Sequence, residues 1–315
     1  MNKQKKPAIK TLINLFPFIS TILLCFSTLT VKADSLIVLS GELQSYRQVA
    51  NAISQNLTTP AKVVVLDKIT EPSVFNDYEE VVAVGSKASI GLFNTLPNNK
   101  KLYLTFLPSQ TYKSLLAKNK NHARLVSSTV TAIYLDQPYP RQIALARFVA
   151  PNANKIATAF GPHSQKEKPQ LKSAAAKYNF TLIHETLNAS DNPVHTLQPL
   201  IRQADVFLSL PDKSIFNRTT AKWILYISFR QKIPLIGFSK KYVDAGAIAA
   251  VFSTPEQIGK QTAELIEKSK LNKRLPPAQF PQYFSVATNP NAAKSLRISI
   301  PTSESLSKAL REGEQ

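Results

Sequence analysis

Short apolar runs of strand length alternate along this chain with longer segments whose apolar residues recur at helical spacing. The runs are continuous and rich in Val, Ile and Leu, which is typical of strands covered on both faces, as in parallel sheets. In the first part of the chain the pattern predicts strands at 36–39, 62–66, 80–84 and 101–106, and helices at 45–57 and 111–118.

The same alternation begins again near residue 129. It predicts strands at 129–134, 155–160, 180–185, 205–210, 234–238, 247–252 and 283–287, and helices at 140–149, 164–178, 194–203, 219–231, 291–296 and from 254 onward. A Pro-rich stretch at 275–281 is expected to be a connector. A βαβα order that occurs twice predicts an α/β protein with two doubly wound parallel-sheet lobes.

Local sequence signals refine three of these helices. Ser164 and Glu167 have the spacing of a capping box, and so do Thr254 and Gln257. The segment 219–231 is apolar nearly all round, so we expect a well-buried helix there.

The N-terminal residues have the composition of a targeting segment. Four lysines and no acid lie within 1–10, and an almost wholly apolar run covers 12–26. Two small residues, Val31 and Ala33, precede Asp34. A basic, then apolar, then small-residue order predicts a secretory signal peptide at 1–33, cleaved after Ala33. We therefore expect an exported protein, located in a Gram-negative periplasm.

Two other readings of this segment are less favoured. A membrane anchor needs about 20 apolar residues, and this run is shorter and contains Pro17. Lipidation at Cys25 would require a small residue before the cysteine, where the chain has Leu24.

Charge and cysteine content narrow the function classes. The chain has 39 basic and 20 acidic residues, a net charge of +19. Removing 1–33 takes away five lysines and no acid, which leaves +14 and no cysteine. A disulfide framework and a Cys-rich metal site are thus excluded. The basic residues are spread along the chain, which indicates a solvated surface, so we expect no nucleic-acid partner.

Catalytic signatures are missing from the sequence. It contains no His-Glu-x-x-His pair, Gly-x-Ser-x-Gly elbow, Walker loop or Gly-x-Gly-x-x-Gly fingerprint. The four histidines are scattered, and His163 alone follows a predicted strand. We therefore expect no enzymatic activity, no cofactor and no metal site.

Short polar residues follow the carboxyl ends of the predicted strands, where ligands bind in open parallel sheets. Each of them is also an ordinary helix N-cap, so capping is the competing interpretation for any one of them. As a set facing one another from two lobes they are the predicted ligand-binding residues, namely Ser40, Ser86, Ser109, Ser164, Asp212 and Ser239.

From about residue 129 onward the chain resembles a known family through an ordered series of segments. They are Ala150-Pro-Asn-Ala-Asn-Lys-Ile-Ala157, Gly161-Pro-His-Ser164, Ala204-Asp-Val-Phe-Leu-Ser-Leu-Pro-Asp212, Lys232-Ile-Pro-Leu-Ile-Gly-Phe-Ser-Lys240, Tyr242-Val-Asp-Ala-Gly-Ala247, Gly259-Lys-Gln-Thr262 and Asn289-Pro-Asn-Ala-Ala293. The family is that of ABC transporter substrate-binding proteins, including tryptophan- and tyrosine-binding members.

The resemblance implies a type I periplasmic-binding-protein fold, with two lobes joined by crossover strands. Lobe one would comprise 34–130 and 251–282, and lobe two 131–250 and 283–315. Ser86, Asp212 and Ser239 correspond to polar positions of the family's ligand loops. The first half departs from the family pattern, so the identity of the ligand does not carry over.

The function expected from these observations is solute binding for an ABC-type importer. A monomer would close on a small solute, an amino acid or related anion being one candidate, and then meet an inner-membrane permease. The alternative is a periplasmic sensory or accessory protein that reports the solute to a membrane receptor without import. An enzyme on the same fold ranks last, because no cluster of polar groups with a plausible base is evident.

Overall fold

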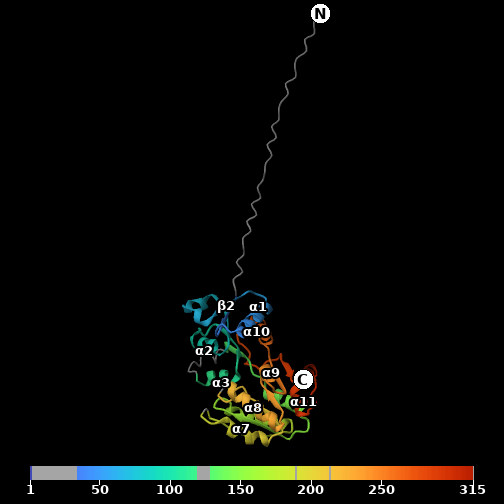
Figure 1. Cartoon of the computed structure of the whole chain (residues 1–315). Coiled ribbons are helices and arrows are strands. Elements are labelled where there is room, and N and C mark those ends of the chain that lie inside the picture. The colour runs from blue at the N-terminus through green and yellow to red at the C-terminus, as the bar shows by residue number, and fades with distance from the viewer. Residues whose placement is uncertain (2–33, 119–127, 189, 213, 315) are drawn as a thin grey trace. The chain divides into compact units, whose positions relative to one another are not determined.

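The protein contains two β-sheets, each flanked by helices (Figure 1). The computed structural model describes Met1 and residues 34–118, 128–188, 190–212 and 214–314. The predicted signal peptide therefore lies outside the described residues, apart from Met1. No helix within the described residues is long and apolar enough to cross a membrane.

The first sheet is wholly parallel and has the strand order β2-β1-β3-β4-β5. We call the part of the chain built on it the first lobe. Its strands are β1 (Ser35–Leu39), β2 (Ala61–Val65), β3 (Glu80–Val84), β4 (Lys101–Leu107) and β5 (Val130–Tyr134).

The second sheet has the order β11-β10-β9-β8-β6-β7 and carries the second lobe. It is parallel except for its edge strand β11, which pairs antiparallel with β10. Its strands are β6 (Lys155–Phe160), β7 (Thr181–Thr186), β8 (Val206–Leu208), β9 (Leu235–Gly237), β10 (Ala249–Phe252) and β11 (Ser285–Thr288). The predicted fold class, two doubly wound α/β lobes, is confirmed.

Helices follow nearly every strand. The α-helices are α1 (Gln44–Asn56), α2 (Ser86–Thr95), α3 (Ser109–Lys118), α5 (Tyr139–Val149), α6 (Lys168–Lys177), α7 (Pro193–Arg202), α8 (Arg218–Gln231), α9 (Lys240–Asp244), α10 (Pro255–Ser269), α11 (Pro290–Leu296) and α12 (Ser303–Glu312). Short 3-10 helices are η1 (Leu66–Lys68), η2 (Pro72–Asp77) and η3 (Gln165–Glu167).

The inner strands are buried on both faces, as their continuous apolar runs predict. Along β1, Leu36 and Val38 enter one hydrophobic cluster, while Ile37 and Leu39 enter another on the opposite side of the sheet. This is the two-sided burial that a doubly wound sheet requires.

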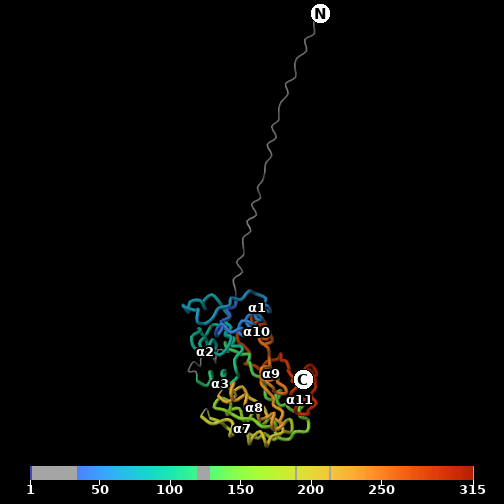
Figure 2. The backbone as a smooth tube through the Cα atoms, viewed as in Figure 1, coloured from blue at the N-terminus to red at the C-terminus, as the bar shows by residue number. Residues whose placement is uncertain are grey.

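Helix α10 returns the chain to the first lobe and lies beside α1, as both ribbon and tube show (Figures 1 and 2). The contact is close because Gly259 has no side chain: a Cβ there would lie 2.6 Å from the carbonyl oxygen of Val49. The hydroxyls of Thr262 on α10 and Thr105 on β4 are hydrogen-bonded at 2.7 Å. A segment that is distant in sequence thus completes the first lobe.

The two lobes are joined where three segments cross between the sheets. The first follows β5, the second links β10 to α10, and the third links α10 to β11. The side chain of Gln137 in the first donates to the Ser253 hydroxyl in the second at 2.8 Å, and that hydroxyl donates to the Tyr283 carbonyl in the third at 2.6 Å. The predicted lobe boundaries near 130 and 250 lie beside these crossings and remain predictions.

A buried arginine, Arg141, binds the crossings together. Its guanidinium donates to the side-chain oxygen of Gln137 at 2.6 Å, to the carbonyl of Pro281 at 2.9 Å and to both carboxylate oxygens of Glu314. It also lies over the ring of Phe284, 4.0 Å from the ring centroid. The Arg141 cation is therefore shared by a side chain of the first crossing, a backbone group of the third crossing and a residue near the C-terminal end of α12.

Two local expectations are wrong and one is confirmed. The Ser164–Glu167 capping box does not form, because the Ser164 hydroxyl bonds to Asp212 instead. The Thr254–Gln257 box is present in full. Helix α8 is amphipathic, not wholly buried: Ile224 and Ile227 point into the core, whereas Trp223, Tyr226 and Phe229 are 46%, 56% and 56% exposed.

We predict that Arg141→Ala destabilises the protein strongly. Its removal leaves the buried groups of Gln137 and Pro281 without a donor, whereas Glu314 is exposed and can turn to water. Buried acceptors left unsatisfied cost about 1–3 kcal/mol of unfolding free energy. Urea unfolding followed by circular dichroism measures this loss. The control is Arg202→Ala, because Arg202 is exposed and should change the free energy by less than ~0.5 kcal/mol. Equal effects of the two variants would contradict the assigned role of Arg141.

Candidate functional site

Each sheet has a point where neighbouring strands are not consecutive in the chain and their connections leave to opposite sides. In the first sheet this point lies between β1 and β3, and in the second between β6 and β8. Loops diverge at the carboxyl ends there and leave a crevice, the usual ligand position in such folds. Four of the six predicted site residues follow these strands, namely Ser40, Ser86, Ser164 and Asp212.

In the first lobe, Ser40 supports the start of helix α2. Its hydroxyl donates to the carbonyl of Val84 at 2.8 Å and accepts from the backbone N–H of Ala88 at 2.9 Å. Gly85 lies between, with φ of 87°, and a Cβ there would be 2.7 Å from the Ser40 hydroxyl oxygen. Gly85 is the N-cap residue of α2 and has no side chain, so Ser40 supplies the capping hydroxyl. Ser86 is the first residue of α2 and is partly exposed.

In the second lobe, Asp212 is buried within a ring of donors. One carboxylate oxygen accepts from the Ser164 hydroxyl at 2.8 Å and from the N–H groups of Ser164 and His163 at 2.9 and 3.2 Å. The other accepts from the hydroxyl and N–H of Ser214 at 2.5 and 3.1 Å. Burial alone would raise the pKa of Asp212, but the bonds from Ser214 and Ser164 outweigh it and hold the pKa below its ordinary value.

The other two predicted residues occupy different environments. Ser109 is buried, and its N–H and hydroxyl donate to the two oxygens of Asp136 at 2.6 and 2.5 Å. Burial raises the pKa of Asp136 despite these bonds. Ser239 is the N-cap residue of α9, without a side-chain capping bond. Contact of these six residues with a ligand remains a prediction.

A cavity of about 740 Å³ opens between the lobes at these strand ends. The first lobe contributes the start of α2 and one face of α3, and the second contributes loops after β6 and β8. Of the six predicted residues only Ser86 lines it, while His163 and Pro211 are sequence neighbours of Ser164 and Asp212. The lining residues are Ser86, Ile90, Asn94, Pro108, Gln110, Thr111, Ser114, Leu115, Lys118, Pro162, His163, Lys166 and Pro211.

The sequence contained a signal for part of this lining. Five of the residues lie at 110, 111, 114, 115 and 118, which is the spacing of one helix face. The predicted helix at 111–118 included most of them, but its apolar pattern says nothing about what faces its polar side. Three prolines of the lining, at 108, 162 and 211, follow the ends of β4, β6 and β8.

A bridge between the lobes borders the cavity. Glu167 of η3 accepts from Lys113 at 2.8 Å and Gln110 at 3.1 Å, both on α3 of the first lobe. It also accepts from the hydroxyl of Tyr139 at 2.5 Å. Burial and the nearby Glu167 raise the pKa of Tyr139 well above its ordinary range. Glu167 is thus the acceptor through which α3 meets the second lobe.

The cavity lining carries positive charge only. Lys118 and Lys166 line it, together with His163, and none of the described residues in its lining is acidic. Among the described residues no group of three or more His, Cys, Asp or Glu side chains could hold a metal ion.

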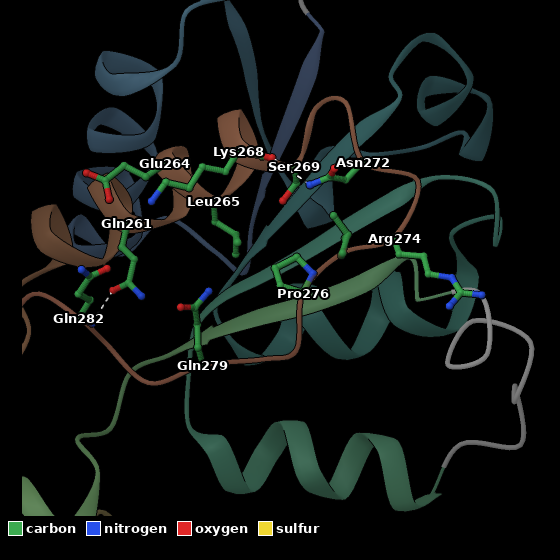
Figure 3. A pocket seen from close by; sticks show the side chains of 11 residues that line it. Gln261, Glu264, Leu265, Lys268, Ser269, Asn272, Arg274, Pro276, Gln279 and Gln282 are labelled. Carbon is green, nitrogen blue, oxygen red and sulfur yellow. Dashed lines mark hydrogen bonds between the residues drawn. The ribbon is translucent and has the colours of Figure 1, made fainter.

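A second cavity, of about 370 Å³, lies against α10 and the connector that follows it. Figure 3 shows Gln261, Lys268 and Gln279 around it, with Gln282 donating its N–H to the Gln261 side-chain oxygen at 2.7 Å. The connector also pairs beside β5 through Ile133 and Gln279. This cavity contains none of the predicted site residues, so we place the functional site at the strand ends.

Comparisons with known proteins identify a family and a shared fold. A family model described as ABC transporter substrate binding protein matches residues 111–312. A search of curated proteins finds no match.

Three solved structures share the fold at low sequence identity. A substrate binding protein with adhesive properties from Clostridium difficile, ligand-free and open, has a TM-score of 0.68 and 17% identity over 86% of this chain and 96% of its own. A conserved domain protein from Vibrio cholerae has a TM-score of 0.59 and 18% identity, over 88% of this chain and 98% of its own. An ABC domain in complex with L-Trp from Streptococcus pneumonia has a TM-score of 0.57 and 16% identity, over 87% of this chain and 98% of its own.

We predict that Gly161→Ala disturbs the Asp212 ring. A Cβ at Gly161 would lie 2.6 Å from an oxygen of Asp212 and 2.7 Å from the Ser214 hydroxyl, so these groups must move. Overpacking of this kind lowers the unfolding free energy by about 1–3 kcal/mol. Gly41→Ala is the matched control, because nothing lies within 4 Å of its Cβ position. Chemical denaturation of both variants checks this, and an unchanged midpoint for Gly161→Ala would contradict the geometry.

Proposed function

We propose that this chain, which belongs to the ABC transporter substrate-binding protein family, is the periplasmic solute-binding component of an importer. The observation that carries the proposal is the cavity between the lobes, lined by strand-end loops and helices from both sheets. The lobes would be 34–130 with 251–282 and 131–250 with 283–315.

The mechanism we infer is closure of the lobes on a small solute. The three crossings, held together by Arg141, Gln137 and Ser253, would act as the hinge. A solute that contacts both lobes binds the closed form better than the open form, and it therefore shifts the population toward closure. The closed form would then be recognised by an inner-membrane ABC permease.

Two relatives of the fold support this mechanism. One was solved with L-Trp, a small solute, and another in a ligand-free, open form. Neither assigns a solute to this chain, because identities of 16% and 17% carry the fold alone. The alternative role, reporting the solute to a membrane receptor without import, uses the same closure. A permease and ATPase encoded beside this chain would favour import.

We predict that a small solute raises the melting temperature of the purified protein and that blocking the cavity abolishes this shift. Ligand at 100 times its dissociation constant stabilises the folded state by about 2.7 kcal/mol. Ser114→Trp places a large side chain on the α3 face that lines the cavity, at an exposed position. Thermal shift against amino acids, small peptides, purines, sugars and carboxylates is the measurement.

The control variant is Asn51→Trp, at an exposed position of α1 that does not line the cavity. It should respond to solute like the unmodified protein. If no small solute at millimolar concentration stabilises the unmodified protein, the proposed function fails.

A further inference from the structure

We propose that the solute is an organic anion without an ammonium group, an inference that rests on the proposed function. Three titratable residues line the cavity, namely Lys118, Lys166 and His163, and all three are basic. A cleft of one charge sign between low-dielectric walls concentrates the field and attracts the opposite charge.

Two acids are direct sequence neighbours of lining residues, Asp212 beside Pro211 and Glu167 beside Lys166, and both are already hydrogen-bonded. Asp212 is 1% exposed and accepts five hydrogen bonds, which exceeds the roughly four lone-pair positions of a carboxylate. Glu167 is buried and accepts from Lys113, Gln110 and Tyr139. An ammonium group in the cavity would find neither carboxylate open to it, and burying such a cation unpaired is costly.

The two lysines are available to a ligand. Within the described residues neither Lys118 nor Lys166 has a hydrogen-bond or ion-pair partner, and both side chains are exposed at the cavity. They come from opposite lobes, so an anion placed between them would contact both and favour closure. Helix α2, which starts at Ser86 and has no acidic residue in its first turn, adds a positive dipole end to the same space.

The remaining lining selects an anion with an apolar body. Ile90 and Leu115 from the first lobe, and Pro162 and Pro211 from the second, present hydrocarbon to the cavity. Burying apolar ligand surface stabilises a complex, and a bare inorganic anion has no such surface. The structure therefore favours a carboxylate, phosphate ester or sulfonate with a hydrocarbon part.

The test compares ligands that share a hydrocarbon part and differ in their charged groups. Isothermal titration of the purified protein would use 3-phenylpropionate, phenylalanine and 2-phenylethylamine, and then hexanoate, norleucine and pentylamine, with sulfate and inorganic phosphate as bare anions. The organic carboxylates should bind more tightly than the zwitterions by at least about tenfold, and the amines should not bind. Their affinity should also fall as ionic strength rises.

Lysine variants test the same inference without dependence on the skeleton. Lys118→Met with Lys166→Met should weaken carboxylate binding by about tenfold or more. Lys62→Met with Lys172→Met removes two other exposed lysines, which line neither the cavity nor the α8 face, and should leave binding unchanged. Tighter binding of a zwitterion, amine or bare anion would overturn the anion inference and leave the proposed function intact. If none of these probes binds and the wider solute screen is also negative, the proposed function itself fails.

A different observation supports a second inference, about helix α8. Its exposed side carries Trp223, Tyr226 and Phe229, and the first two rings form an edge-to-face pair with centroids 6.0 Å apart. Arg218 and Lys222 border a recess of about 580 Å³ beside these rings. The helix contains three cations and no acid.

We infer that this face, defined by Arg218, Lys222, Trp223, Tyr226 and Phe229, docks on an anionic lipid membrane. Trp and Tyr rings prefer the headgroup region of a bilayer, where one side is apolar and the other wet. Basic residues near an anionic surface add electrostatic attraction. Charge complementarity therefore favours a lipid surface over an apolar protein partner.

The single tryptophan of the chain provides a direct readout, because Trp223 is the only one. Vesicles containing phosphatidylglycerol should shift its fluorescence emission to the blue and should sediment with the protein, whereas pure phosphatidylcholine vesicles should do neither. Tyr226→Ser with Phe229→Ser, and separately Lys222→Glu, should weaken cosedimentation by about fivefold. Phe148→Ser is the matched control, because Phe148 is 41% exposed on α5, outside this face.

Two results would overturn the membrane inference. One is equal binding to both kinds of vesicle with no change in emission. The other is a blue shift that follows protein concentration without vesicles, which would mean that a second copy of the chain covers the face.

Discussion

A buried guanidinium at the crossings between the lobes is the constraint on which the two-lobe arrangement depends. Arg141 cannot lose its proton, so its charge must be balanced and its donors satisfied inside the protein. The partners are Gln137, Pro281 and Glu314, which come from distant parts of the chain. They meet at the guanidinium only when the first and third crossings and the C-terminus are all in place.

The position of this network determines what can move. The crossings are fixed to one another at Arg141, whereas the cavity side of the lobes is joined through Glu167, whose partner Lys113 is itself exposed. Glu167 itself is buried, so this link pairs one buried and one exposed group, as the Arg141–Glu314 pair does. The lobes are thus connected at the crossings by the several partners of Arg141, and beside the cavity by the single carboxylate of Glu167. Under the proposed closure, a solute that bridges the cavity would act on the same side as the Glu167 contacts.

Most of the fold was predictable because strand formation here is a local property. Uninterrupted β-branched runs such as 80–84 are buried on both faces, and their composition alone indicates this. Helix α2 was missed because Gly91 interrupts it and its apolar residues have no clear helical period. The apolar content of helix α8 predicts burial, but content alone does not say in which direction each side chain points. Ile224 faces the core, whereas its neighbour Trp223 lies on the exposed side of the helix.

The position of the site in the fold was predictable from the sequence, but the contacts of its side chains were not. Parallel strands bring their carboxyl ends to one edge, so residues after strands gather there whatever the sequence between them. Which side chain then faces the cavity depends on contacts between segments far apart in sequence. Ser164 and Asp212 are 48 residues apart and bond to each other, and Ser40 is bonded to the start of α2. Lys118 and Lys166 belong to no sequence motif. They line the same cavity only because the two lobes pack together.

The excess of basic residues can be interpreted from the positions of the acids. Asp212, Asp136, Glu167 and Glu80 are all hydrogen-bonded within the protein, and Glu314 is bound to Arg141. These carboxylates hold loops and lobes in position. Most of the other acids lie at exposed positions, so the basic excess follows from the composition, 39 basic against 20 acidic residues. What distinguishes the cavity and the outer side of α8 is local: the described residues of the cavity lining and of helix α8 include cations and no acid. Both inferred partners are anionic for that reason.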